Sequence, residues 1–248
     1  MGLYREWLAV AAIVFSLSAT AQAADTVLDV MPETLVNGWD GEAELGFVMT
    51  SGNTDTRSLN AKALISYNMD RHVTQASVEV LKASDSGVTT AERYLLAAKS
   101  KYYFQPLEYL FTSARYEDDR FSGYDYQTSL TAGYGRRVLE HESVYLDMEG
   151  GAGARRRAPV AGTAKTEGIV RGAGFFLWQI SPTSKFTQDL LVESGADNTY
   201  SEAVTALSVK INSSLAMKTS LSVRHNSQVP AGTEKTDTIT AVNLVYDF

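Results

Sequence analysis

Apolar and polar side chains alternate with a period of two along almost the whole chain after residue 38. Because successive side chains of a strand point to opposite faces, this period predicts strands with one apolar and one polar face. The last such segment, residues 238–248, ends on an apolar and aromatic face made by Val242, Leu244, Tyr246 and Phe248. A strand of this kind crosses a membrane only in a closed sheet, because hydrocarbon leaves the backbone groups of an open edge unsatisfied.

The alternation recurs in twelve segments, which are residues 39–49, 59–68, 75–80, 93–104, 109–117, 126–138, 144–149, 167–178, 185–193, 202–211, 217–224 and 238–248. In residues 167–178 it is weaker, because Ile169, Phe175 and Leu177 interrupt the polar face. We therefore predict an all-β fold: a transmembrane, antiparallel, up-and-down β-barrel of about 12 strands. An even strand number places both chain ends on the periplasmic side.

The connections predicted between these strands alternate in length. Tight turns are expected at residues 69–72, 105–108, 139–142, 181–184 and 213–214, and longer loops at 85–92, 118–125, 156–166 and 227–236. Two further connections on the longer-loop side, 51–56 and 195–199, are short exceptions. Short periplasmic turns and longer outer loops are typical of bacterial outer-membrane barrels.

The aromatic residues support the same orientation. One group is expected at the periplasmic rim: Trp39, Tyr67, Tyr102, Phe104, Tyr134, Trp178, Phe186, Tyr246 and Phe248. A second is expected at the outer rim: Phe47, Tyr94, Tyr116, Phe121, Tyr124, Tyr126 and Tyr200. Two aromatic girdles suit the two membrane interfaces, whereas a soluble periplasmic β-sandwich, the alternative fold, has no need of them.

The N-terminal segment has the pattern of an export signal. Arg5 precedes the mostly apolar run Trp7–Leu17, and Ala21-Gln22-Ala23 forms an A-x-A cleavage site. The apolar run is shorter than the roughly 20 residues that span a bilayer. We therefore predict a cleaved signal peptide at residues 1–23, a periplasmic segment at 24–37 and a barrel at 38–248, in the outer membrane of a Gram-negative bacterium.

Composition excludes several classes of function. The chain has no cysteine, which excludes disulfides, thiolate metal sites and cysteine nucleophiles. Its net charge of −7 is unchanged by removal of the signal peptide, because Arg5 and Glu6 leave together. An acidic chain without a basic cluster argues against a nucleic-acid partner. The remaining 225 residues (248 minus 23) suffice for one large β domain.

Two partners follow from the membrane location. The C-terminal stripe Val242, Leu244, Tyr246 and Phe248 resembles the recognition signal of the barrel-assembly machinery, and we expect that machinery to be a partner during biogenesis. The run Arg155–Arg157 is expected in an outer loop, where it is either solvated or paired with lipopolysaccharide phosphates. We otherwise expect a monomer that contacts outer-membrane lipid.

Charged residues on the polar faces are candidates for the lumen lining. They are Glu42, Glu44, Lys62, Arg93, Lys99, Lys101, Arg137, Asp147, Glu149, Arg171, Asp189, Glu193, Lys210 and Arg224. Barrels near eight strands are filled by side chains and those of 16–18 strands hold an aqueous channel, so about 12 strands leave both outcomes open. These mixed charges either fill a narrow lumen with ion pairs or line a hydrated pore.

Catalytic chemistry has little support in the sequence. His72 and His141 fall in expected turns, and His225 falls at the outer end of a strand. We therefore expect none of them to act as a general base that activates a nucleophile. No spacing resembles a histidine-rich metal site or a calcium loop. We expect no catalytic residue, no cofactor and no metal, although a lipid-modifying barrel enzyme stays an alternative.

Several stretches together resemble one known family. They are Ala43–Asn60 (AELGFVMTSGNTDTRSLN), Thr90–Tyr94 (TAERY), Asp119–Tyr126 (DRFSGYDY), Asp197–Thr199 (DNT) and Val229–Thr238 (VPAGTEKTDT). In this order they are similar to the salt-induced outer-membrane proteins, domain of unknown function 481; Gly150–Arg157 follows the pattern less closely. The resemblance implies an outer-membrane location and supplies no catalytic residues. From the barrel and its charged lumen together with this resemblance, we expect a structural or envelope and salt-stress role with a narrow or plugged lumen, with a small-solute or ion pore as the alternative.

Overall fold

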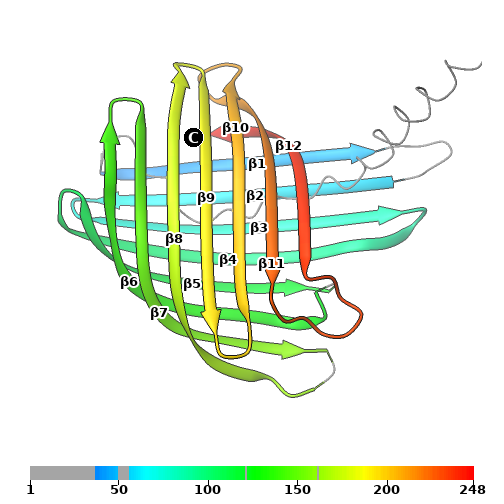
Figure 1. Cartoon of the computed structure of the whole chain (residues 1–248). Coiled ribbons are helices and arrows are strands. Elements are labelled where there is room, and N and C mark those ends of the chain that lie inside the picture. Colours follow the sequence, from blue (N-terminus) through cyan, green and yellow to red (C-terminus); the bar gives the residue numbers. More distant parts are fainter. Residues whose placement is uncertain (1–36, 50–55, 121, 161) are drawn as a thin grey trace, which may run out of the picture.

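The computed structural model describes residues 37–49, 56–120, 122–160 and 162–248, and the predicted signal peptide and most of the predicted periplasmic segment lie outside these residues. The described chain is a closed antiparallel barrel in which each strand pairs with its sequence neighbours and the last strand returns to the first (Figure 1). Its strands are β1 (Gly38–Met49), β2 (Thr56–Met69), β3 (His72–Asp85), β4 (Val88–Gln105), β5 (Glu108–Asp119), β6 (Tyr124–His141), β7 (Val144–Pro159), β8 (Lys165–Ser181), β9 (Ser184–Gly195), β10 (Thr199–Lys210), β11 (Leu215–Asn226) and β12 (Thr236–Asp247). The predicted fold class is thus confirmed. The described residues include no helix long and apolar enough to cross a membrane.

Burial in this barrel is the reverse of that in a soluble protein. Outward-facing apolar side chains such as Leu45, Leu130 and Val242 are exposed, while inward-facing Arg93, Lys101 and Asp147 are buried. Strand β8 resolves the ambiguity noted in its sequence, because Phe175 is buried inside while Val170 and Trp178 are exposed outside. An apolar outer band around a polar interior is the pattern that lipid requires.

The connections differ in length between the two ends of the barrel. At the end where β1 begins and β12 finishes, the connections 70–71, 106–107, 142–143 and 182–183 have two residues each and 211–214 has four. At the opposite end 86–87 and 196–198 are also short, but 160–164 has five residues and 227–235 has nine, so the longest connections lie there. We take the end with the tight turns as periplasmic and the opposite end as outer.

Two connections depart from the sequence prediction. The expected loop at 85–92 is a two-residue turn, because Ser86 (φ 51°) and Gly87 (φ 80°) both adopt left-handed backbone conformations that suit a hairpin. The expected loop at 156–166 shortens to 160–164, so Arg155–Arg157 lies in β7 and not in a solvated loop. Both errors arose because strands extend wherever backbone pairing continues, even where the side chains are polar or charged.

Aromatic residues at each rim contact one another between strands. At the periplasmic end, ring centroids lie 4.6 Å apart for Trp39 and Tyr67 on the neighbouring strands β1 and β2. They lie 6.2 Å apart for Phe104 and Tyr134, which stand on β4 and β6 at either side of β5. At the outer end Tyr116 and Tyr126 stack at 6.1 Å. The outer-rim prediction was wrong for Tyr200, whose ring faces the lumen and packs beside Phe175 and Leu191. Phe121 lies outside the described residues.

The C-terminal residue takes part in closing the barrel. Gly41 N donates to Phe248 O at 2.8 Å, and Phe248 N donates to Gly41 O at 2.9 Å. A Cβ atom on Gly41 would lie 2.4 Å from the Phe248 ring, so a larger residue at position 41 would require this ring to move. The Phe248 ring also stacks on Tyr246 at 6.0 Å.

Deleting Phe248, or changing Tyr246→Asp, is therefore expected to reduce the fraction of folded barrel in outer-membrane fractions, measured as heat-modifiable mobility on gels. The deletion removes two closing hydrogen bonds together with the predicted assembly signal. Phe248→Tyr keeps the ring and the backbone groups and serves as the control. Wild-type assembly of the deletion variant would contradict the expectation.

Candidate functional site

The predicted lumen residues occupy one continuous interior surface. Glu44, Lys62, Arg93, Lys99, Lys101, Asp147, Glu149, Arg171, Glu193 and Arg224 are buried, and Glu42, Arg137 and Asp189 are partly buried. Lys210 shares the inward register but lies exposed at the periplasmic end of β10. The contacts below also involve Glu79, which the alternation likewise places inward, and Arg115, Glu117, Glu202 and Lys218, which lie on the same faces but were not among the candidates.

A belt of ion pairs crosses the lumen. Arg224 of β11 lies 3.4 Å from Glu117 of β5, and these strands stand on opposite sides of the closed sheet. Arg115 of β5 reaches Glu202 of β10 at 3.7 Å. Ion pairs between non-adjacent strands must pass through the lumen, so this belt obstructs it.

Glu117 is the centre of that belt. Its Oε1 accepts from Arg93 Nε at 3.0 Å and from Arg224 Nη1 at 3.4 Å, and its Oε2 accepts from Arg115 Nη2 at 2.8 Å. Arg93 also contacts Glu79 at 3.2 Å. One carboxylate thus contacts three guanidinium groups in a site largely removed from water, and Glu79 and Glu202 add negative charge beside Arg93 and Arg115.

A second cluster lies between β4 and β8. Lys99 Nζ lies 2.6 Å from Glu149 and 4.5 Å from the centroid of the Phe175 ring. Glu149 also accepts from Arg171 at 3.1 Å and from the Tyr109 hydroxyl at 3.0 Å. Because β4 and β8 are not neighbours, the contact of Lys99 with Phe175 narrows the lumen at this level as well.

Glu44 organises the wall on the side of β1. It lies 3.4 Å from Lys62 and 2.8 Å from Lys218, and it accepts from Asn243 Nδ2 at 2.8 Å. Glu42, which shares the same face, lies 3.9 Å from Lys218. Lys218 thus contacts both of the acidic side chains that lie two positions apart in the sequence.

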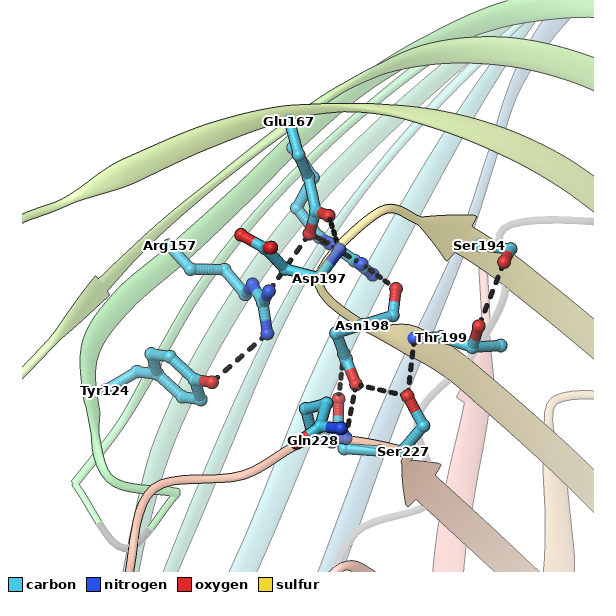
Figure 2. Close-up of polar contacts among 11 residues, drawn as sticks. Tyr124, Arg157, Glu167, Ser194, Asp197, Asn198, Thr199, Ser227 and Gln228 are labelled. Atoms are coloured by element: carbon cyan, nitrogen blue, oxygen red, sulfur yellow. Dashed lines mark hydrogen bonds and ion pairs between the residues drawn. The ribbon is translucent and has the colours of Figure 1, made fainter.

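Asn198 connects three elements at the outer mouth. Its Nδ2 donates to Asn226 Oδ1 at 2.8 Å, and its Oδ1 accepts from Ser227 Oγ at 3.2 Å and from Gln228 N at 2.9 Å (Figure 2). Its carbonyl oxygen accepts from Arg155 Nη2 at 2.6 Å. The side chain is only 3 % exposed, although it lies in a short loop. From the sequence, Asn198 could be recognised only as a residue type that is common in turns.

Glu167 holds the neighbouring part of the mouth. It accepts from Arg155 at 2.9 Å, from Arg157 at 3.0 Å and from the backbone N–H of Asp197 at 2.8 Å. Arg157 also donates to the Tyr124 hydroxyl at 3.1 Å, as Figure 2 shows. Arg155 and Arg157 therefore face inward, and only Arg156 of the basic run is exposed on the outer surface.

The β11–β12 loop extends across the mouth. A Cβ atom on Gly123, which lies in the β5–β6 loop, would be 2.9 Å from Pro230 Cγ and 2.9 Å from Thr233 Oγ1. The β5–β6 loop and the β11–β12 loop belong to strand pairs on opposite sides of the closed barrel. Residues 227–235 thus form a lid, which Asn198 holds at one side and Gly123 meets at the other.

A small cavity lies among the charged residues of the outer half of the lumen. Its volume is about 30 Å³, and it is lined by Arg115, Glu117, Gln127, Thr128, Ser129, Arg155, Glu193 and Tyr200. That space suits one or a few water molecules and not a larger solute. Within the described residues, no group of three or more histidine or acidic side chains could hold a metal ion.

Asn198→Ala is expected to loosen the lid. The change removes three side-chain hydrogen bonds to residues 226–228, at a local cost of about 1–3 kcal/mol. Amide hydrogen exchange of residues 227–235 should therefore speed up while that of β11 stays slow. Asn212→Ala is the matched control, because Asn212 accepts two backbone hydrogen bonds in a periplasmic turn. Equal exchange of the lid in both variants would show that Asn198 does not hold it.

Comparison with known proteins agrees with this architecture. The chain is 31 % identical over 234 residues to the uncharacterized protein YdiY of Escherichia coli K12, covering 92 % of each chain. In structure it is similar to the COG4313 outer-membrane channel of Pseudomonas putida F1, with a TM-score of 0.52, 14 % identity and coverage of 91 % of this chain and 100 % of the other. It is also similar to the NanC porin, with a TM-score of 0.50, 9 % identity and coverage of 85 % and 97 %.

The likeness to the channel and the porin shows the fold alone, that of an outer-membrane barrel. The family assignment rests on the sequence. A family model matches residues 43–248, which include nearly the whole barrel. With this match and the YdiY relative, the chain belongs to the family described as protein of unknown function, DUF481.

Proposed function

We propose that this outer-membrane barrel is a structural component of the envelope, with a role under salt or envelope stress, and that its own side chains close its lumen. The observation that carries the proposal is the belt in which Arg224 contacts Glu117 and Arg115 contacts Glu202 across the lumen. A barrel that served as an open diffusion pore would keep these side chains against its walls.

We also propose a route of biogenesis and a lipid environment for the barrel. The chain is exported by its signal peptide, is inserted by the barrel-assembly machinery and resides as a monomer among outer-membrane lipid and lipopolysaccharide. We propose no catalytic activity. Among the histidines, the exposed ring of His72 packs against Tyr102 at 4.8 Å. His225 Nδ1 lies 2.9 Å from Thr236 Oγ1, but both residues are exposed at the outer rim, and we propose no catalytic role for them.

A small pore is the second candidate, and two observations favour it. Asp189 faces the lumen while staying partly exposed, and the cavity beside Glu193 has room for water. A path for ions or small solutes could join these sites once the lid and the belt move apart.

Conductance in planar bilayers distinguishes the two functions. The refolded wild-type protein is expected to be silent or nearly so over a range of voltages. The double variant Glu117→Gln/Asn198→Ala, which weakens both the belt and the lid, should open more often than wild type. Stable, discrete wild-type channels would overturn the closed-lumen proposal and establish the pore.

A further inference from the structure

The seam between β1 and β12 is much shorter than the other strand pairings. Within the described part of the chain, only four residue pairs join these strands, from Glu42 with Asp247 to Leu45 with Leu244, followed by the backbone bonds of Gly41 with Phe248. By comparison, β1 pairs with β2 along its full length from Gly38 to Met49. The ladder of the seam therefore stops near the middle of the barrel, although both strands continue toward the outer end.

The unpaired part of the seam faces lipid. Phe47 and Val242, which would form the next outward-facing pair of this register, are 62 % and 55 % exposed. Backbone groups without partners are unfavourable in hydrocarbon, which is why membrane barrels normally close along their whole height. An edge left unpaired at this position is consequently a site where something other than β1 can approach β12.

Orphaned polar atoms lie behind the same part of the seam. Ser220 Oγ and Ser222 Oγ on β11 and Asn60 Oδ1 on β2 are buried without a hydrogen-bond partner in the described structure. Ser220 and Ser222 pair in register with Ala241 and Ile239 of β12, and Asn60 pairs with Gly46 of β1. Such atoms are costly in a closed interior and gain partners when a polar group reaches them.

We propose that β1 and β12 part in the outer half of the barrel and form a lateral slot that admits a lipid of the outer leaflet. The acyl chains stay in the bilayer against Phe47 and Val242. The head group, which carries hydrogen-bond donors and acceptors, enters between the strands toward Ser220, Ser222 and Asn60. This slot does not depend on whether the lumen conducts ions.

The absence of cysteine allows a site-specific test. A fluorophore on Ser220→Cys reports from behind the seam, and one on Thr131→Cys of β6 reports from the opposite wall of the lumen. Each refolded protein is placed in nanodiscs of phosphatidylcholine with or without a nitroxide on the lipid head group. Lipid access through the seam predicts quenching at position 220 and none at position 131.

Locking the seam provides the decisive control. In this variant the fluorophore at position 220 is attached to an alkyne-bearing unnatural amino acid, so that no third cysteine is present. A disulfide between Phe47→Cys and Val242→Cys, formed before labelling, should then abolish the quenching. Quenching that persists in the locked barrel, or that is equal at positions 220 and 131, would overturn the slot. Absence of quenching at position 220 in the unlocked barrel would also overturn the slot.

A measurement on the unlabelled wild-type protein covers the case in which labelled variants fail to fold. Amide hydrogen exchange in lipid should be faster for residues 238–242 of β12 than for residues 74–80 of β3, which is paired on both sides. Equal protection of the two segments would show that the seam stays closed and would overturn the proposal.

Discussion

Glu117→Gln is expected to lower the free energy of unfolding of the refolded barrel by about 3–5 kcal/mol, the usual cost of removing one partner from a buried ion pair. Glu117 is the carboxylate shared by Arg93, Arg115 and Arg224, and the change leaves their charges with less compensation. The measurement is urea unfolding followed by tryptophan fluorescence. Glu44→Ala and Lys101→Ala should change stability in the same direction, because both side chains are buried among charged or aromatic groups.

The matched control for Glu117→Gln is Glu92→Gln. Glu92 makes its ion pair with Arg120, whose side chain is 67 % exposed, so solvent screens the pair and its loss should change stability little. A hydrated lumen would give another pattern. In that case Glu117→Gln would leave stability unchanged, and it would shift the reversal potential of the current under a salt gradient.

Leu207→Arg and Val242→Arg are each expected to destabilise the barrel by about 2–4 kcal/mol, because both place a charge on the lipid-facing surface near the bilayer midplane. Both wild-type side chains are exposed on the outside of the barrel. Refolding into lipid vesicles at increasing urea concentrations measures the loss.

The control for Leu207→Arg lies at the next position in the strand. Ser208 faces the lumen and pairs in register with Lys185 and Lys218, so Ser208→Glu adds a charge beside two of opposite sign and should cost little. Asn243 is a poorer control for Val242, because its side chain is buried and bonded to Glu44 and Asn60. If Ser208→Glu proved more damaging than Leu207→Arg, the assignment of faces would be reversed along β10.

The period of two was enough to predict the barrel, its strand number and most of the inward and outward positions. The reason is physical: a strand in lipid must present an apolar side chain at every second position, so each strand carries its orientation in its own sequence. Residues such as Leu45, Val242 and Tyr246 follow this local rule. The rule also identified Glu44, Lys62 and Arg224 as lying on the polar, inward-facing surface.

Only the tertiary structure decided which polar groups meet. Glu117 and Arg224 are 107 positions apart in the chain, and closure of the sheet brings them within 3.4 Å across the lumen. The role of Asn198 likewise depends on a loop packed against residues 226–228, and the short seam depends on how β12 meets β1. A repeating pattern specifies the face on which a side chain lies, whereas its partner depends on the diameter and stagger of the closed barrel, which no single strand encodes.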